Sequence, residues 1–592
     1  MQRPGVKCFG AFCGVAILYI LLSGLGLRLN GLATPAEPGE NAAWVGGSRY
    51  WLDRQFCSWV GSCGMMHLRE TGWIWEQLKD EVPNMPPDLA PFWTSSKENP
   101  DSWSQDERQL REIPQYVFDH APYVHLFSGE DFWPSDVAEH LTHVSPRLNW
   151  TTMNDMEVDR NLTNLHDLND VDGGRHGRFM YLSSADNVEE WPSWLTSIHN
   201  VPMSPDPRLD IEQQDDDPVG DAPANIDLES AVKQQGSPIG IPYPRLPTDL
   251  RPSTNGRCGG NSGFTCVKSK FGNCCSIHGW CGKSDQHCDS YCDPLHGKCA
   301  DPLHPPQGPK PDLRKHKRDF MKEQDRPSKL GKSKAPAILI VADKGNGTVD
   351  AFWFYFYSFN LGQKVLKIRF GNHVGDWENT MIRFKDGKPQ AVYLSEHNFG
   401  DAYSWSAMEK YVPNPDGSMA ATWSNATFHQ VAKRPVTYSA VGSHAMYAAP
   451  GLHPYILPWG LLHDQTDRGP LWDPAQNVQS YTYDVASQAM RASTRNPFSP
   501  TGWLDYAGHW GDKYYPLSDP RQYRLAGQYH YVNGPTGPKF KGLGREKVCR
   551  SRGECHIRKW VGEEGDKAQR LIPAEGEEEG GLPGGNSTDD AA

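Results

Sequence analysis

The segment VDAFWFYFYSFN, from Val349 to Asn360, carries the strongest secondary-structure signal in this chain of 592 residues. Its dense aromatic side chains fit a pleated sheet better than a helix. Similar short apolar runs surround it: AILIVADKG lies before it, and DWENTMIRF, QAVYLSEH, RPVTYSAVG and QSYTYDV follow. Asp386-Gly387 stands between two of these runs, and this dipeptide predicts a tight hairpin. We therefore predict a mainly β, sandwich-like domain over residues 335–545.

Polar residues interrupt one of these strands in the sequence GNHVGDWE. Because side chains alternate along a strand, Asp376 and Glu378 are expected on one face and Trp377 on the other. With His373 just before them, these carboxylates could hold a divalent metal ion. Oxygen ligands favour Ca²⁺, Mg²⁺ or Mn²⁺, and the imidazole shifts the preference toward Mn²⁺ or Zn²⁺. Further polar residues that follow other strands could complete such a site: His397, His444, Asp464 and Asp467.

Two other interpretations of His373, Asp376 and Glu378 stay open. The three side chains could satisfy one another in a buried network, which is common for carboxylates in a core. They could also supply the paired carboxylates of a glycoside hydrolase. The chain has no G-x-S-x-G or H-E-x-x-H motif, and Ser443 beside His444 forms no known nucleophile motif. The sequence therefore favours a protein that is not an enzyme.

A second feature is a dense run of cysteines within residues 255–300. Such a segment is too short to bury a core of its own, and an even number of close cysteines predicts a framework of disulfides. Zinc is the rival interpretation, but adjacent cysteines suit a zinc site poorly. The eight cysteines are Cys258, Cys266, Cys274, Cys275, Cys281, Cys288, Cys292 and Cys299.

The motifs RCGGNSGFTC, GNCCSIHGWCGKSDQHC and DSYCDPLHGKC resemble the hevein-type (type 1) chitin-binding module. The resemblance implies binding of N-acetylglucosamine oligomers. By it, Ser276 would contact the acetamido carbonyl, Trp280 would stack on the sugar, and His278 and His287 would occupy the other two aromatic positions. It also implies the disulfides Cys258–Cys275, Cys266–Cys281, Cys274–Cys288 and Cys292–Cys299.

The region that surrounds this module resembles the fungal family named after vacuolar protein sorting-associated protein sixty-two. The resemblance rests on FGNHVGDWENTMIRF, VYLSEHN, RPVTYSAVGSHAMY and HDQTDRGPLWDP, and upstream on APYVHLFSGEDFWPSD and YLSSADNVEEWPSWL. It implies one domain in two parts, 111–250 (which includes a linker) and 335–545. The cysteine-rich module and a basic linker, 301–334, are inserted between them. The family name establishes no activity.

GNHVGDWE is also similar to the GHRHDWE heptapeptide of the necrosis- and ethylene-inducing-like cytolysins, although Gly375 replaces its second histidine. Those proteins are secreted β-sandwiches that bind a divalent cation and membrane sphingolipids. The resemblance covers about eight residues. It adds a metal-dependent, membrane-active protein to the alternatives.

The N-terminal segment indicates where the protein is located, and its net charge restricts the kinds of partner it can bind. Residues 1–30 place basic residues before an uncharged run at 8–27, which predicts either a cleaved secretory signal or an uncleaved anchor in a membrane. Residues 31–110 are rich in Trp and Pro, with Cys57 and Cys63 close enough to pair, and the tail, 546–592, is acidic at its end. A net charge of -13 excludes nucleic acid as the main partner.

Together these features predict a fungal-type glycoprotein that is secreted or held at the cell surface and binds chitin in the cell wall. N-glycosylation sequons stand at Asn149, Asn161, Asn346, Asn425 and Asn586. A single-pass protein with an uncleaved anchor is the alternative for its location. For the β domain, the alternatives are a hydrolase of cell-wall glycan that the module targets to its substrate, or the membrane-active protein.

Overall fold

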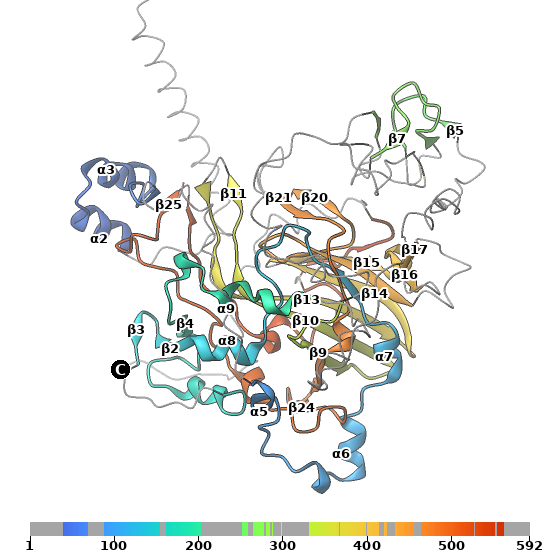
Figure 1. Cartoon of the computed structure of the whole chain (residues 1–592), viewed down its shortest axis with the longest axis horizontal. Helices are drawn as coiled ribbons and strands as arrows, with labels where there is room; N and C mark the ends of the chain where they lie inside the picture. Colours follow the sequence, from blue (N-terminus) through green and yellow to red (C-terminus); the bar gives the residue numbers. More distant parts are fainter. Residues whose placement is uncertain are drawn as a thin grey trace, which may run out of the picture. The chain divides into compact units, whose positions relative to one another are not determined.

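The computed structural model describes two compact units of the chain, Met1–Met203 with Pro327–Ala592, and Ser204–Arg326 (Figure 1). We call them the β unit and the cysteine-rich unit. The described residues are 39–68, 88–153, 161–202, 251–258, 264–276, 280–283, 287, 296, 298, 331–365, 368–397, 399–413, 419–422, 433–454, 463–525, 527–550 and 553–561. Within them no helix is long and apolar enough to cross a membrane. The N-terminal apolar run at 8–27 lies outside them.

An eight-stranded sheet forms the centre of the β unit, so the mainly β prediction is confirmed. Its longest pair is β10 (Thr348–Asn360) with β13 (His373–Lys385), antiparallel from Thr348 opposite Lys385 to Asn360 opposite His373. The order is β24-β23-β9-β10-β13-β14-β15-β27. The other members are β9 (Ala337–Asp343), β14 (Lys388–Glu396), β15 (Phe399–Ser404), β23 (Val478–Asp484), β24 (Met490–Ala492) and β27 (Ile557–Arg558).

The predicted hairpin joins β13 to β14. Asp386 and Gly387 have φ of 49° and 73°, both in the left-handed region. A type I′ turn needs positive φ at both central residues, and its twist matches that of the flanking strands. The Asp-Gly dipeptide therefore sets the register of this pair, from Lys385 opposite Lys388 inward.

A second sheet joins the two halves of the β unit. Its order is β17-β16-β18-β1-β22, and β19 also pairs with β18. β1 (Tyr123–His125) comes from the part before the cysteine-rich unit, and it lies parallel to β18 (Arg434–Ser439), which comes from the part after it. The remaining strands are β16 (Lys410–Pro413), β17 (Met419–Thr422), β19 (Met446–Tyr447) and β22 (Leu471–Trp472).

Short helices and strand pairs complete the described structure. The helices are α2 (Glu40–Gly47), α3 (Trp51–Val60), α5 (Ala90–Trp93), α6 (Gln105–Leu110), α7 (Gln115–Asp119), α8 (Val137–His143) and α9 (Ser193–Thr196). The minor strands are β2 (Val144–Leu148), β3 (Thr151–Thr152), β4 (Met180–Ser184), β11 (Lys364–Val365), β12 (Ile368–Arg369), β20 (Gly451–Pro454), β21 (His463–Thr466), β25 (Arg524–Leu525) and β26 (Gln528–Tyr529). The disulfides Cys57–Cys63 and Cys549–Cys555 close two short loops of this unit.

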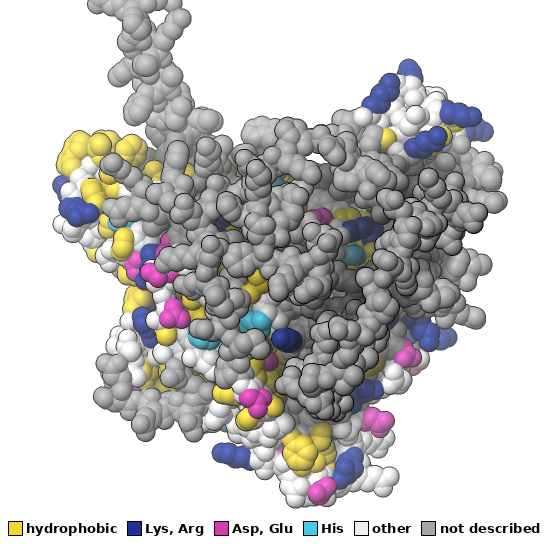
Figure 2. Space-filling view, viewed as in Figure 1, with side chains coloured by type: hydrophobic (Ala, Val, Ile, Leu, Met, Phe, Trp, Pro, Cys, Tyr) yellow, Lys and Arg dark blue, Asp and Glu magenta, His cyan; other side chains and the backbone are white. Residues whose placement is uncertain are grey.

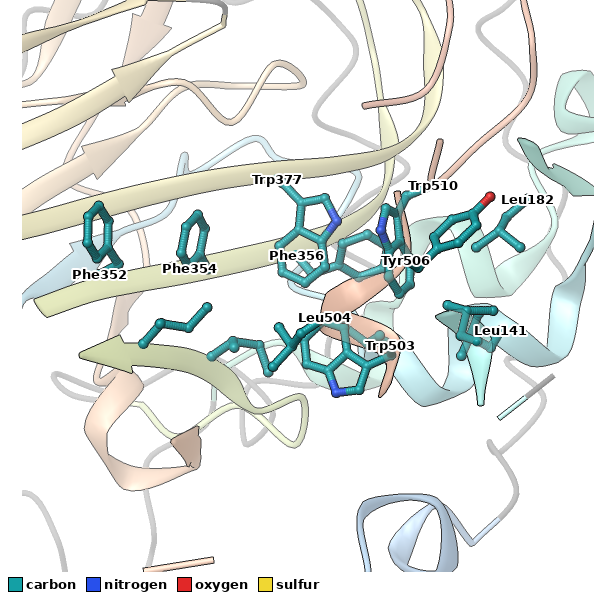
Figure 3. Packing of buried hydrophobic residues seen from close by; sticks show 14 of the residues in the cluster. Leu141, Leu182, Phe352, Phe354, Phe356, Trp377, Trp503, Leu504, Tyr506 and Trp510 are labelled. Atoms are coloured by element: carbon teal, nitrogen blue, oxygen red, sulfur yellow. The ribbon is translucent and has the colours of Figure 1, made fainter. Parts of the chain in front are cut away.

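The two faces of the β10–β13 pair differ in chemistry. On one face Phe356 and Trp377 pack with their ring centroids 4.6 Å apart, in a core that also contains Trp503 and Trp510 (Figure 3). The other face carries tyrosines and carboxylates, because Tyr357 lies opposite Asp376 and Tyr355 lies opposite Glu378. Residues opposite each other in an antiparallel pair share a face.

In the cysteine-rich unit the described backbone forms two small ladders. β5 (Arg251–Pro252) pairs with β6 (Phe264–Thr265), and β7 (Cys274–Cys275) pairs with β8 (Cys281–Gly282). Its described apolar cluster consists of cysteines alone. Disulfides therefore stabilise this unit in the way that a hydrophobic core stabilises larger domains.

Candidate functional site

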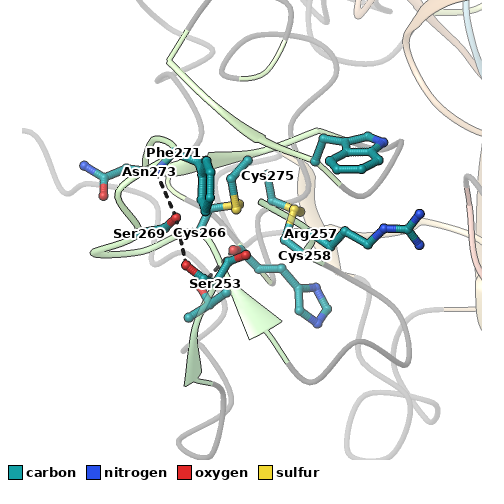
Figure 4. Close-up of a disulfide and its surroundings, with 12 residues drawn as sticks. Ser253, Arg257, Cys258, Cys266, Ser269, Phe271, Asn273 and Cys275 are labelled. Carbon is teal, nitrogen blue, oxygen red and sulfur yellow. Dashed lines mark hydrogen bonds between the residues drawn. A yellow bond between two sulfur atoms is a disulfide. The ribbon is translucent and has the colours of Figure 1, made fainter. Parts of the chain in front are cut away.

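Two disulfides of the small unit join the β7–β8 ladder to residues that precede it in the chain. The disulfides Cys258–Cys275 and Cys266–Cys281 have Cα atoms 6.0 and 5.3 Å apart, and they are the pairs that the hevein resemblance implies. Figure 4 shows the sulfurs of Cys258, Cys266 and Cys275 close together. Cys274 is also in a disulfide, but its predicted partner Cys288 and the pair Cys292–Cys299 lie outside the described residues.

Beside these disulfides the indole of Trp280 is 46% exposed. The Trp280 backbone N–H donates to Ser276 Oγ at 3.2 Å, and the Ser276 N–H donates to the Trp280 carbonyl at 2.9 Å. Arg257 forms a β-bridge with Trp280, and its guanidinium lies 5.0 Å from the centre of the indole. Four contacts thus fix the backbone and one side of an open aromatic ring.

Two predicted sugar contacts are histidines. His287 is half-buried and packs on the backbone of Gly282, where an added Cβ would come within 2.2 Å of its ring. Glycine at 282 therefore permits this close approach. His278 lies outside the described residues. The structure thus places Ser276, Trp280 and His287 within one small unit.

The second candidate site is the polar face of the β10–β13 pair. Asp376 and Glu378 lie on this face and Trp377 lies on the other, as the alternation of side chains predicts. Both carboxylates are buried. A buried carboxylate needs a partner, and each has one of a different kind.

Asp376 is paired with a histidine from the β18–β19 turn. His444 Nδ1 lies 2.9 Å from Asp376 Oδ2, and the imidazole stacks on Tyr357 with centroids 3.7 Å apart. His444 has φ of 57°, so the turn holds it in a conformation that non-glycine residues rarely adopt. This arrangement orients the imidazole beside the carboxylate.

Glu378 accepts a hydrogen bond from the hydroxyl of Ser395. Burial and the neighbouring Asp376 raise the pKa of Glu378, which favours the neutral form of this carboxyl. His373 Nδ1 lies 2.7 Å from the Gly375 carbonyl oxygen, and burial lowers the pKa of this histidine. Each predicted metal ligand is therefore already engaged.

This geometry bears on the predicted metal ion. Among the described residues, the group of three ligand atoms within 4.8 Å of one another belongs to Cys258, Cys266 and Cys275, whose sulfurs are in disulfides. A cation at His373, Asp376 and Glu378 would require these side chains to leave their present hydrogen-bond partners. The metal site stays a prediction, which the metal content of the purified chain tests.

Asp464 forms a second buried centre close to the first. It accepts hydrogen bonds from Gln363 and Ser443 at 2.7 Å and from Tyr447 at 2.8 Å, and His397 Nε2 lies 2.8 Å from Oδ2. The Ser443 hydroxyl thus donates to Asp464 and not to the neighbouring His444. Asp467 instead accepts from the Ser128 backbone N–H at 2.8 Å. The polar interior is an extended network with no nucleophile–base pair among these contacts.

Sequence reasoning missed the residues that complete the network: Glu130, Tyr357, Gln363, Ser395 and Tyr447. Glu130 accepts from the Gly442 backbone N–H, 312 residues away in the chain. No local spacing signals such a contact.

The His397–Asp464 pair makes stability depend on pH. Burial lowers the pKa of His397, but the Asp464 carboxylate outweighs this effect and raises the pKa to about 9. Because the folded pKa exceeds the unfolded value of about 6.5, the stabilisation is complete below pH 6.5 and is lost as pH rises through 9. We expect the free energy of unfolding to fall by up to about 1.4 kcal/mol per pH unit in this window.

Denaturant titrations at several pH values measure this slope. His397→Asn is the matched variant, because asparagine tolerates the φ of 56° found at this position. The variant should show a smaller slope between pH 6.5 and 9. An equal slope in both proteins would contradict the assignment.

The chain is similar to known proteins over segments of very different length. The chain is 43% identical over 221 residues to vacuolar protein sorting-associated protein 62 of Saccharomyces cerevisiae. This alignment covers 36% of this chain and 46% of the yeast protein. The chain thus spans about half the length of this relative. No family model matches the chain, and no solved structure matches it.

Short alignments link the chain to two further fungal proteins. It is 49% identical over 53 residues to the non-secreted LysM effector LCP1 of Gibberella moniliformis, covering 9% of this chain and 7% of that protein. It is 39% identical over 49 residues to a chitin deacetylase of Pestalotiopsis sp, covering 8% and 15%. The chain is therefore similar to the yeast protein over 221 residues and to these two proteins over 53 and 49 residues.

Proposed function

We propose that the cysteine-rich unit binds chitin, through the C–H face of an N-acetylglucosamine ring stacked on Trp280. The observation that carries the proposal is the open, anchored indole at the surface of a unit held by disulfides. Aromatic rings bind sugars by covering the apolar face of the pyranose. A fixed ring loses little conformational freedom on binding, which favours affinity from so small a surface.

Ser276 supplies the polar part of the proposed site. Its Oγ accepts the Trp280 backbone N–H, which leaves the hydroxyl hydrogen to donate. An acetamido carbonyl beside the indole is a suitable acceptor. The buried position of Ser276 fixes the direction of this donor. The two groups together select an N-acetylated sugar over an unmodified one.

The short alignments support this proposal. Their lengths, 53 and 49 residues, are close to that of the segment 255–300, and one of the two proteins is named for its action on chitin. The finer identification as a hevein-type module also belongs to the proposal. It rests on the cysteine motifs and on the two disulfides that agree with them.

Trp280→Ala is expected to lower retention of the full chain on chitin beads by about 5- to 150-fold, because the stacking surface is removed. Loss of stacking of about 1–3 kcal/mol corresponds to this range. Phe271→Ala is the matched control, since Phe271 is an exposed aromatic of the same unit, 38% exposed. Equal retention of the Trp280→Ala variant and the wild type would reject the proposed platform.

We further propose that the chain matures in the secretory pathway and acts outside the cell or in the cell wall, either released or held by an N-terminal anchor. Disulfides support this location, because they persist in oxidising compartments. The sequon at Asn346 lies in an exposed turn before β10, a position that suits N-glycosylation.

Glycosidase treatment of the natively expressed chain should therefore increase its electrophoretic mobility. Asn346→Gln should remove part of this shift, and Asn360→Gln, at a buried asparagine without a sequon, should leave the shift unchanged. A chain whose mobility does not respond to the glycosidase would count against passage through the secretory pathway.

A further inference from the structure

Helix α3 of the β unit turns its large apolar side chains outward. They are exposed by 60%, 59%, 43% and 74%, in the order Trp51, Leu52, Phe56 and Trp59. At about 100° per residue, these four positions lie within one arc of about 140° around the helix. Figure 2 shows hydrophobic side chains gathered on the surface over α2 and α3. A surface helix normally points such a stripe at the core, so an outward stripe indicates an interaction surface.

The opposite face of α3 is held to the protein by polar and covalent contacts. Asp53 is 1% exposed, and its carboxylate accepts the backbone N–H groups of Met65 and Met66 at 3.0 and 3.4 Å. Cys57 is buried in its disulfide with Cys63. These contacts fix the side of the helix that faces the protein, so the apolar stripe stays outward while they are intact.

The charges available beside this stripe are positive. Asp53 is the only acid in the sequence of α3, and it lies on the buried side. Arg49, just before the helix, is exposed, and Arg54 is half-buried. Arg49 donates to the Tyr50 hydroxyl and Arg54 donates to the Ser48 carbonyl. Each guanidinium has five N–H donors, so both keep donors for an anionic partner.

The residue types and the length of α3 favour a lipid bilayer as that partner. Tryptophan is enriched at the boundary between lipid and water, and α3 presents two tryptophans on one face. Basic residues beside an apolar face complement anionic headgroups. The ten residues of α3 span about 15 Å, half of the roughly 30 Å of a hydrocarbon core. The helix is therefore suited to lie in the interface and not to cross the bilayer.

We propose that the exposed face of α3 binds the surface of a lipid bilayer that contains anionic lipids. The four apolar side chains enter the boundary between headgroups and acyl chains, and Arg49 and Arg54 pair with lipid phosphates. The proposal is independent of chitin binding, because every residue it uses belongs to the β unit. It is also independent of whether the apolar run at 8–27 is cleaved.

Hydroxyl-radical footprinting of the full chain, read by mass spectrometry, tests this contact at single residues. Vesicles of phosphatidylcholine and phosphatidylserine are expected to protect Trp51 and Trp59 from oxidation in a saturable way. Phe498 and Trp560, exposed by 52% and 40% outside α3, should stay reactive, and they correct for radicals that the lipid consumes. Vesicles of phosphatidylcholine alone should need about thirtyfold more lipid for half-protection, because two arginines lose their anionic partners.

Trp59→Ala should raise the lipid concentration for half-protection of Trp51 about tenfold, because one large apolar contact is lost. Phe498→Ala is the matched control and should leave that concentration unchanged. Three outcomes would overturn the proposal. The vesicles leave Trp51 and Trp59 as reactive as Trp560, Trp59→Ala is protected at the same lipid concentration as Phe498→Ala, or α3 is protected without lipid. Protection by N-acetylglucosamine oligomers would assign the face to a sugar, and protection at raised protein concentration would assign it to a second copy of the chain.

Discussion

Replacing Trp377 by alanine is expected to lower the free energy of unfolding of the β unit by about 3–5 kcal/mol. Trp377 is 2% exposed, and its ring centroid lies 4.6 Å from that of Phe356 and 5.7 Å from that of Trp510. Removing the indole leaves a cavity that the surrounding aromatic rings can fill only in part, so both transfer free energy and packing contacts are lost.

Urea denaturation followed by near-ultraviolet circular dichroism measures this loss. Trp560→Ala is the matched control, because Trp560 is 40% exposed, and it should cost less than about 1 kcal/mol. Similar midpoints for the two variants would show that Trp377 does not lie in the main core. The same experiment tests the face of β13, since an outward Trp377 would behave as Trp560 does.

Removal of one disulfide is expected to abolish chitin retention altogether. Replacing Cys266 and Cys281 together by serine opens a loop of sequence separation 15. Loss of a native disulfide in a small domain costs about 2–5 kcal/mol, which a unit with a core of cysteines alone cannot offset. The unit should unfold, and with it the anchored position of Trp280.

Limited proteolysis separates this effect from loss of the binding surface. The double variant should be cleaved within residues 251–298, whereas Trp280→Ala should resist the protease although its retention on chitin is reduced. The matched control replaces Cys549 and Cys555 by serine, which removes a disulfide of the β unit. Like the disulfide Cys57–Cys63, it closes a loop of sequence separation 6. This control variant should retain its binding to chitin. Retention by the Cys266/Cys281 variant would contradict the requirement for the disulfide.

Local patterns predicted the parts of the fold that depend on neighbours in sequence. The aromatic run at Val349–Asn360 became the central strand β10, and Asp386-Gly387 made the hairpin turn. Alternation placed Asp376 and Glu378 on one face. In each case a single backbone conformation determines the outcome, so a short window of sequence carries the information.

The partners of these residues could not be predicted in this way. Alternation does not reveal that Asp376 meets His444, 68 residues later, or that four donors converge on Asp464. These contacts depend on how two sheets face each other, which no local spacing encodes.

The pairing of β1 with β18 has a consequence for biosynthesis. Thr437 Oγ1 on β18 bonds to the Tyr123 carbonyl on β1, across 314 residues of chain. At about 5–20 residues per second, the ribosome needs roughly 15–60 s to add that length. The cysteine-rich segment emerges during this delay and can close its own loops, because its described disulfides join cysteines 15 and 17 residues apart. A nascent chain arrested before β18 would thus present a finished small module joined to an N-terminal half that still lacks its partner strand.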